Sequence, residues 1–83
     1  MSTYDYQVQL DIEMKQLGMA IKKLRKTNNL SQKEFQVSAY IVADIEEGKH
    51  IPKIDTLHKI ASEFGMSLAE LFAFSTRATD IQF

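Results

Sequence analysis

The chain has 83 residues, an apolar content of 45% and a net charge of −1, which suit one small globular domain and argue against a disordered chain. It contains no cysteine, which excludes disulfides and thiolate metal sites, and its two histidines are too few for a metal site. No apolar run approaches the roughly 18 residues of a membrane span, and the N-terminus lacks a secretory-signal pattern, so we expect a cytoplasmic protein with no membrane segment.

Charge is distributed unevenly along the chain. Residues 15–59 carry nine Lys/Arg and five Asp/Glu, whereas the flanks carry one Arg and six acids. A basic middle section could face the phosphates of a nucleic acid, but solvated helix surfaces are often charged unevenly as well. The charge pattern alone therefore leaves nucleic-acid binding open.

Residues 4–12 alternate between apolar and polar side chains, and this period of two favours a short strand. Residues 79–83 also alternate and are the candidate partner strand, in the same chain or in a second copy. The alternative is that the first helix begins earlier, with Leu10, Met14 and Leu17 on one face. The alternation favours the strand.

From about residue 11 the apolar period changes to three and four, which predicts a helix with Met14, Leu17, Ile21 and Leu24 on its buried face. Asn28 and Asn29 are expected to end this helix, because Asn tolerates the left-handed conformation. Its opposite face carries lysines, namely Lys15, Lys22, Lys23 and Lys26.

Ser31 and Glu34 form the S-x-x-E pattern of a capping box, which predicts the start of a second helix. Gly48 suits the left-handed residue that ends a helix, and Pro52 marks a connecting loop.

Another helix is predicted from about residue 54 to residue 64, and Gly65 is expected to stop it. Ser67 and Glu70 form a second capping box, which predicts a last helix.

This order of residues resembles the Xre/Cro-type helix-turn-helix family of phage-repressor-like DNA-binding proteins. The resemblance covers about two thirds of the chain and implies an all-α, five-helix domain over residues 1–83, with an arm or strand at 1–12, a core at 13–73 and a tail at 74–83. It rests on LG at 17–18, Ile21, LR at 24–25, LSQKEF at 30–35, VS at 37–38, Val42, IEEGK at 45–49, Pro52, DTL at 55–57, KIA at 59–61, FG at 64–65, Ser67 and ELF at 70–72.

The resemblance also implies roles for particular residues. Arg25 and Glu46 are expected to form a structural ion pair, because a partly buried charge needs a partner. The recognition helix should begin near Ser38, and phosphate contacts position such a protein on DNA. The candidate DNA-binding residues are Gln32, Lys33, Ser38, Ala39, Tyr40, Ala43, Lys49 and Lys53.

The sequence departs from the family pattern in length, because about four residues are missing between Phe35 and Val37. The loss removes about one helical turn. The second helix could then be little more than one turn, or it could fuse with the third into one helix over residues 31–47, about 25 Å long. A shortened hinge also invites domain swapping between two copies.

The expected recognition helix also departs in chemistry, because it presents no basic residue and carries Asp44 and Glu47. Base edges are usually contacted by Arg, Lys, Asn and Gln. The first hypothesis remains a transcriptional regulator that binds double-stranded DNA as a homodimer. The alternative is a protein-interaction module on the same scaffold, such as an anti-repressor or a swapped dimer. Catalytic residues, a cofactor and a metal are not expected.

Overall fold

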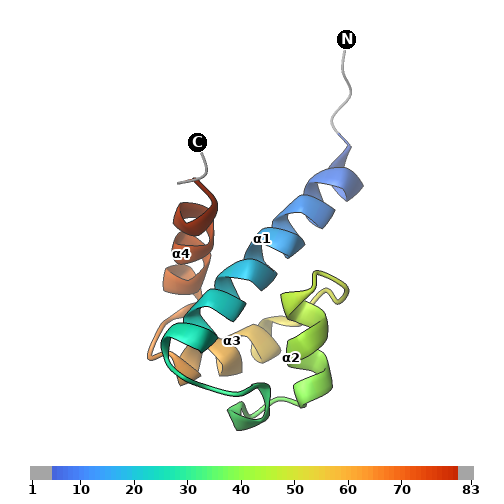
Figure 1. Ribbon diagram of the computed structural model, residues 1–83. Helices are drawn as coiled ribbons and strands as arrows, with labels where there is room; N and C mark the ends of the chain where they lie inside the picture. Colours follow the sequence, from blue (N-terminus) through green and yellow to red (C-terminus); the bar gives the residue numbers. More distant parts are fainter. Residues whose placement is uncertain (1–4, 81–83) are drawn as a thin grey trace.

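The computed structural model describes residues 5–80 and, for side chains, residues 5–77. This part of the chain is helical without strands, which confirms the predicted all-α class. Figure 1 shows the long helix α1 crossing the molecule between α4 and α2, with α3 below. The elements in order are α1 (Tyr6–Thr27), the 3-10 turn η1 (Gln32–Glu34), α2 (Ala39–Glu46), α3 (Ile54–Glu63) and α4 (Leu68–Asp80).

The prediction of a strand in residues 4–12 is wrong for the described residues, because α1 already begins at Tyr6. Asp5 caps this helix: its carboxylate accepts hydrogen bonds from the backbone N–H groups of Gln7 and Val8 at 3.0 and 3.3 Å. Gln7 also donates to the carboxylate of Asp11 one turn later, at 3.0 Å. These local bonds stabilise the helix, whereas a lone strand would lack a pairing partner.

The predicted second helix is only the single turn η1, and the fused helix over residues 31–47 is wrong. Phe35 ends the turn with an extended backbone, at φ −89° and ψ 159°. This conformation places the Phe35 ring in the core, where it packs edge-on against Phe64 with ring centroids 5.7 Å apart. Ser38 then starts α2, and its hydroxyl accepts a hydrogen bond from the backbone N–H of Tyr40 at 3.2 Å.

Helix ends coincide with the residues that the sequence marks. Asn29 is left-handed at φ 57° after α1, and Gly48 is left-handed at φ 73° after α2. At α4 the capping box is complete, since Ser67 N–H donates to Glu70 at 2.8 Å and Glu70 N–H donates to the Ser67 hydroxyl at 3.1 Å. Local chemistry therefore decides these boundaries.

One apolar core joins all the helices. Its fully buried large side chains come from α1, α2, α3 and α4, and Phe35 adds the segment after η1. Burying them supplies the main stabilisation of a domain of this size. The fully buried large side chains are Ile21, Val42, Ile45, Ile60 and Leu71.

Helices α1 and α2 approach each other closely at Gly18. A Cβ atom there would lie against the Ile45 carbonyl oxygen and 2.7 Å from that of Glu46. Because these are backbone atoms, the two helices would have to move apart to admit a side chain. Gly18 thus fixes the position of α2 on α1.

The C-terminal helix α4 continues into the stretch predicted as a tail, as far as Asp80. Residues 79 and 80, the first two of the predicted C-terminal strand, are therefore helical, and residues 81–83 lie outside the described residues. Among the described residues, no helix combines the length and apolar character that crossing a membrane requires.

Candidate nucleic-acid interface

An ion pair ties the end of α1 to the end of α2. The Arg25 guanidinium donates to the Glu46 carboxylate twice, from Nε to Oε2 at 2.6 Å and from Nη2 to Oε1 at 3.0 Å. Both side chains are largely buried, with 13% and 4% of their surfaces exposed. The hydrogen bonds that Arg25 donates to Glu46 raise the pKa of Arg25, so the guanidinium keeps its charge at neutral pH. These are the two residues for which the resemblance implies a structural pair.

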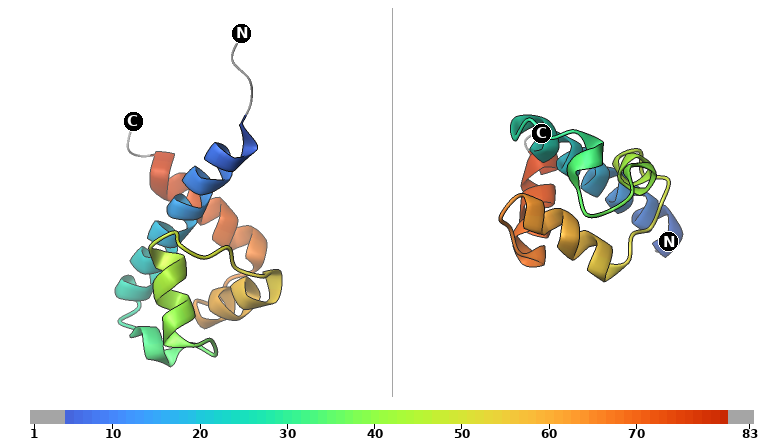
Figure 2. Two further views of the ribbon diagram at one scale, coloured as in Figure 1. Left: turned by 90° about the vertical axis from the view of Figure 1, so that its right-hand side faces the viewer. Right: turned by 90° about the horizontal axis from the view of Figure 1, so that it is seen from below.

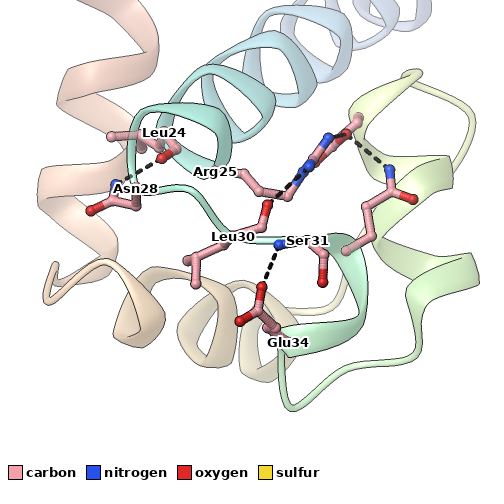
Figure 3. A network of polar contacts seen from close by, with 8 residues as sticks. Leu24, Arg25, Asn28, Leu30, Ser31 and Glu34 are labelled. Atoms are coloured by element: carbon pink, nitrogen blue, oxygen red, sulfur yellow. Dashed lines mark hydrogen bonds and ion pairs between the residues drawn. The ribbon is translucent and has the colours of Figure 1, made fainter.

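The third donor group of Arg25, Nη1, bonds the backbone carbonyl of Leu30 at 3.1 Å. Figure 3 shows Arg25 reaching across from α1, with Leu30 beside it and Ser31 at the start of η1. Ser31 N–H donates to the Glu34 carboxylate at 2.6 Å, which holds the turn closed. Arg25 therefore fixes the entry to η1 as well as α2.

Gln32, the first residue of η1, joins this network. Its Nε2 donates to Glu46 Oε1 at 3.1 Å, and its side chain is half-buried. The oxygens of the Glu46 carboxylate act as hydrogen-bond acceptors for Arg25 and cannot donate to Gln32. The amide nitrogen of Gln32 must therefore face Glu46, and the orientation of the carboxamide is fixed.

The residues expected on the recognition helix lie at the start of α2. Ser38 is its N-cap, and Tyr40 is 85% exposed. Ala39 and Ala43 are half-buried, and Asp44 is exposed. The beginning of α2 therefore presents a phenol and two methyl groups, with an acid one residue beyond.

A cleft of about 530 Å³ opens between the C-terminal part of α1, η1 and α2, which lines it from Ala39 to the C-cap Glu47. Figure 2 shows η1 lying between the end of α1 and α2. We call this the basic cleft, because Lys22, Lys26 and Lys33 line it and form no ion pair with any residue of the described chain. Its residues are Lys22, Arg25, Lys26, Ser31, Gln32, Lys33, Ala39, Ala43, Glu46 and Glu47.

A smaller depression of about 230 Å³ adjoins the basic cleft and shares three of its residues. We call it the α2 notch. It is lined by Gln32, Ala39, Tyr40 and Ala43, and no charged side chain is among them. A polar amide thus sits beside methyl groups and an aromatic ring.

Three of the predicted residues line neither depression, namely Ser38, Lys49 and Lys53. Lys49 pairs with Glu47, with Nζ and Oε1 2.8 Å apart, and this contact raises the pKa of Lys49 and lowers that of Glu47. Lys53 is exposed at the start of α3. Among the predicted set, Gln32, Lys33, Ala39 and Ala43 meet at the basic cleft, Tyr40 lines the α2 notch and Ser38 caps α2.

Lys22 and Lys26 are the candidate residues that sequence reasoning missed. They lie one turn apart on α1, on the face opposite the core, and this spacing is visible in the sequence. Nothing in the sequence shows that η1 and α2 pack beside that face. Within the described residues, no group of three or more His, Cys, Asp or Glu could hold a metal ion.

Comparison with family models decides the family, because residues 21–71, more than half of the chain, match the helix-turn-helix model. The chain belongs to the helix-turn-helix family. By their order in the chain, η1 and α2 correspond to the two helices of the motif, of which such domains place the second in the DNA major groove. Searches of curated proteins and of solved structures gave no match. The match confirms the predicted family, which is one of DNA-binding regulators.

Proposed function

We propose that this helix-turn-helix domain is a sequence-specific transcription regulator of the Xre/Cro type, which acts in the cytoplasm as a homodimer on double-stranded DNA. The observation that carries the proposal is the basic cleft, which three lysines without an ion-pair partner line together with residues of the recognition helix. Phosphate contacts from such lysines position a recognition helix in the groove.

The ion pairs of the molecule support this assignment. Glu46 is neutralised by Arg25, and Glu47 is paired with Lys49, so the two acids at the basic cleft are both compensated. No ion pair within the described residues involves Lys22, Lys26 or Lys33. The phosphates of a DNA backbone that crosses the basic cleft would therefore be the counter-charges of these lysines.

A homodimer matches the geometry of DNA recognition by this family. Two recognition helices about 34 Å apart enter successive major grooves on one face of the duplex, so the operator is expected to be palindromic. The domain-swapped form remains an alternative prediction for the same assembly, because the connection between η1 and α2 is short.

One observation favours the second candidate, a protein-interaction module. The exposed side of α2 carries Asp44 and no Lys or Arg, and an acid close to phosphates weakens DNA binding. An anti-repressor built on this scaffold would use α2 against a protein surface and would tolerate the loss of the cleft lysines.

Salt dependence of duplex binding separates the two candidates. We expect the wild-type protein to bind a mixed-sequence duplex at low salt, with a log–log slope of about −0.9 per phosphate contact. Alanine at Lys22, Lys26 or Lys33 should reduce the slope by about one each. Lys23→Ala and Lys59→Ala are matched controls, since both lysines are exposed helix residues outside the basic cleft and should change the slope little.

Folded wild-type protein that binds no duplex at low salt would contradict the regulator and favour the protein-interaction module. Equal effects of Lys23→Ala and Lys26→Ala on the slope would place the phosphate contacts outside the basic cleft.

A further inference from the structure

The α2 notch has a chemistry that differs from that of the basic cleft. Its lining residues are Gln32, Ala39, Tyr40 and Ala43, without any cation. Guanine presents two acceptors in the major groove, O6 and N7, and is most often contacted by Arg or Lys. Adenine instead presents the N7 acceptor and the N6 donor, and thymine adds its C5 methyl group.

The carboxamide of Gln32 is oriented so that its free groups match the hydrogen-bonding groups of adenine in the major groove. Its Nε2 already donates one hydrogen to Glu46 at 3.1 Å, which leaves the second N–H and Oε1 for a ligand. No residue of the described chain donates a hydrogen bond to Oε1. An N–H donor beside an oxygen acceptor complements adenine N7 and N6, whereas the same oxygen would face guanine O6 unfavourably.

The one arginine near the α2 notch is engaged within the fold through all three of its nitrogens, and only 13% of its side chain is exposed, so it is poorly placed to reach a guanine. Nε and Nη2 of Arg25 bond Glu46, and Nη1 bonds the Leu30 carbonyl. Glu46 therefore has two effects, because it occupies Arg25 and it orients Gln32. Both effects act against a G·C pair at this position.

Ala39 and Ala43 supply the apolar groups for the thymine of the same base pair. They lie one turn apart on α2 and line the α2 notch together with Gln32. Methyl groups of alanine pack on the C5 methyl of thymine, which is an apolar contact in the major groove. Both partners of an A·T pair therefore find a complementary group.

We propose that the α2 notch recognises an A·T pair in the operator, with Gln32 held by Glu46 to contact adenine and Ala39 and Ala43 contacting the thymine methyl. The inference rests on the proposed function and adds a base preference to it. Gln32 determines specificity in this account, and Glu46 is a positioning residue that acts through it.

The test is a selection of duplexes from a random-sequence library, followed by base modification of the selected site. For the wild-type protein we expect each half-site to contain an A·T pair whose preference disappears in Gln32→Met. Replacing that adenine by 7-deazaadenine, which lacks N7, should weaken binding about tenfold. Replacing its thymine by uracil, which lacks the methyl group, should weaken binding roughly fourfold.

Controls separate the contact from a general loss of binding. Gln36→Met changes an exposed glutamine outside both depressions and should keep the A·T preference. The same base modifications outside the selected half-sites should leave affinity unchanged. The modified duplexes test the inference on the wild-type protein, so they decide it even if Gln32→Met does not fold.

Three results would overturn the inference. A selected motif in which the Gln32-dependent position is G·C, or an A·T position that tolerates both modifications, refutes the base preference and leaves the proposed regulator intact. No selected motif from folded protein refutes the proposed regulator, and the base preference with it.

Discussion

The ion pair between Arg25 and Glu46 gives the sharpest prediction of stability. Glu46→Ala removes both carboxylate contacts of the guanidinium, at 2.6 and 3.0 Å, and leaves a side chain that is only 13% exposed without its counter-charge. Breaking a buried pair on one side costs about 3–5 kcal/mol. A domain of 83 residues has a free energy of unfolding of roughly 4–12 kcal/mol, so the variant should lose a large share of its stability.

Urea denaturation at pH 7, followed by circular dichroism at 222 nm, measures this loss. Glu47→Ala is the matched control, because it removes the adjacent glutamate from an exposed pair with Lys49 and should leave the midpoint unchanged. Combining Arg25→Met with Glu46→Leu should recover much of the stability, since an apolar pair leaves no buried charge. If Glu46→Ala lowers the free energy of unfolding no more than Glu47→Ala does, the buried ion pair does not stabilise the fold as argued.

Three further predictions concern the fold and the basic cleft. Gly18→Ala should lower the free energy of unfolding, measured by urea denaturation, by about 1–3 kcal/mol, although alanine is the better helix former. A gain in stability would contradict the close approach of α1 and α2. Asp5→Ala should accelerate amide hydrogen exchange at the first turn of α1 with little change in thermal midpoint, whereas unchanged exchange would deny the cap. Glu47→Gln removes a negative charge from the basic cleft and leaves Lys49 without its ion-pair partner, so the affinity for a DNA duplex at low salt should rise several-fold. Weaker binding would contradict a DNA contact at the basic cleft.

Helix boundaries could be predicted wherever one residue decides them locally. Asn29 and Gly48 adopt the left-handed conformation that ends α1 and α2, and Ser67 with Glu70 caps α4 as the S-x-x-E pattern indicates. These signals depend on chemistry within a few residues, and so they can be seen without the fold.

The N-terminal stretch was mispredicted because two periodicities overlap there. Tyr6, Val8 and Ile12 alternate as in a strand, yet they are 69%, 54% and 46% exposed on α1. Leu10 continues the buried face of the helix and is half-buried. The cap at Asp5 and the lack of a partner strand among residues 5–80 decide between helix and strand, and only the cap could have been recognised from the sequence.

The candidate site could be predicted only in part. Gln32, Lys33, Ala39 and Ala43 were expected at the interface from the family pattern, and the structure brings them together at the basic cleft. Lys22 and Lys26 lie on α1, at least six residues before Gln32, so their place in the basic cleft depends on how α2 and η1 are placed beside α1. The bond from Gln32 to Glu46 depends on the same packing.

A binding selection from a random-sequence duplex library at two salt concentrations tests the central claim most directly. The account predicts enrichment of one palindromic motif that is lost as salt rises, and loss of enrichment when Lys22, Lys26 and Lys33 are all changed to alanine. No enrichment at low salt, from wild-type protein that is helical and folded, would contradict DNA recognition by this domain.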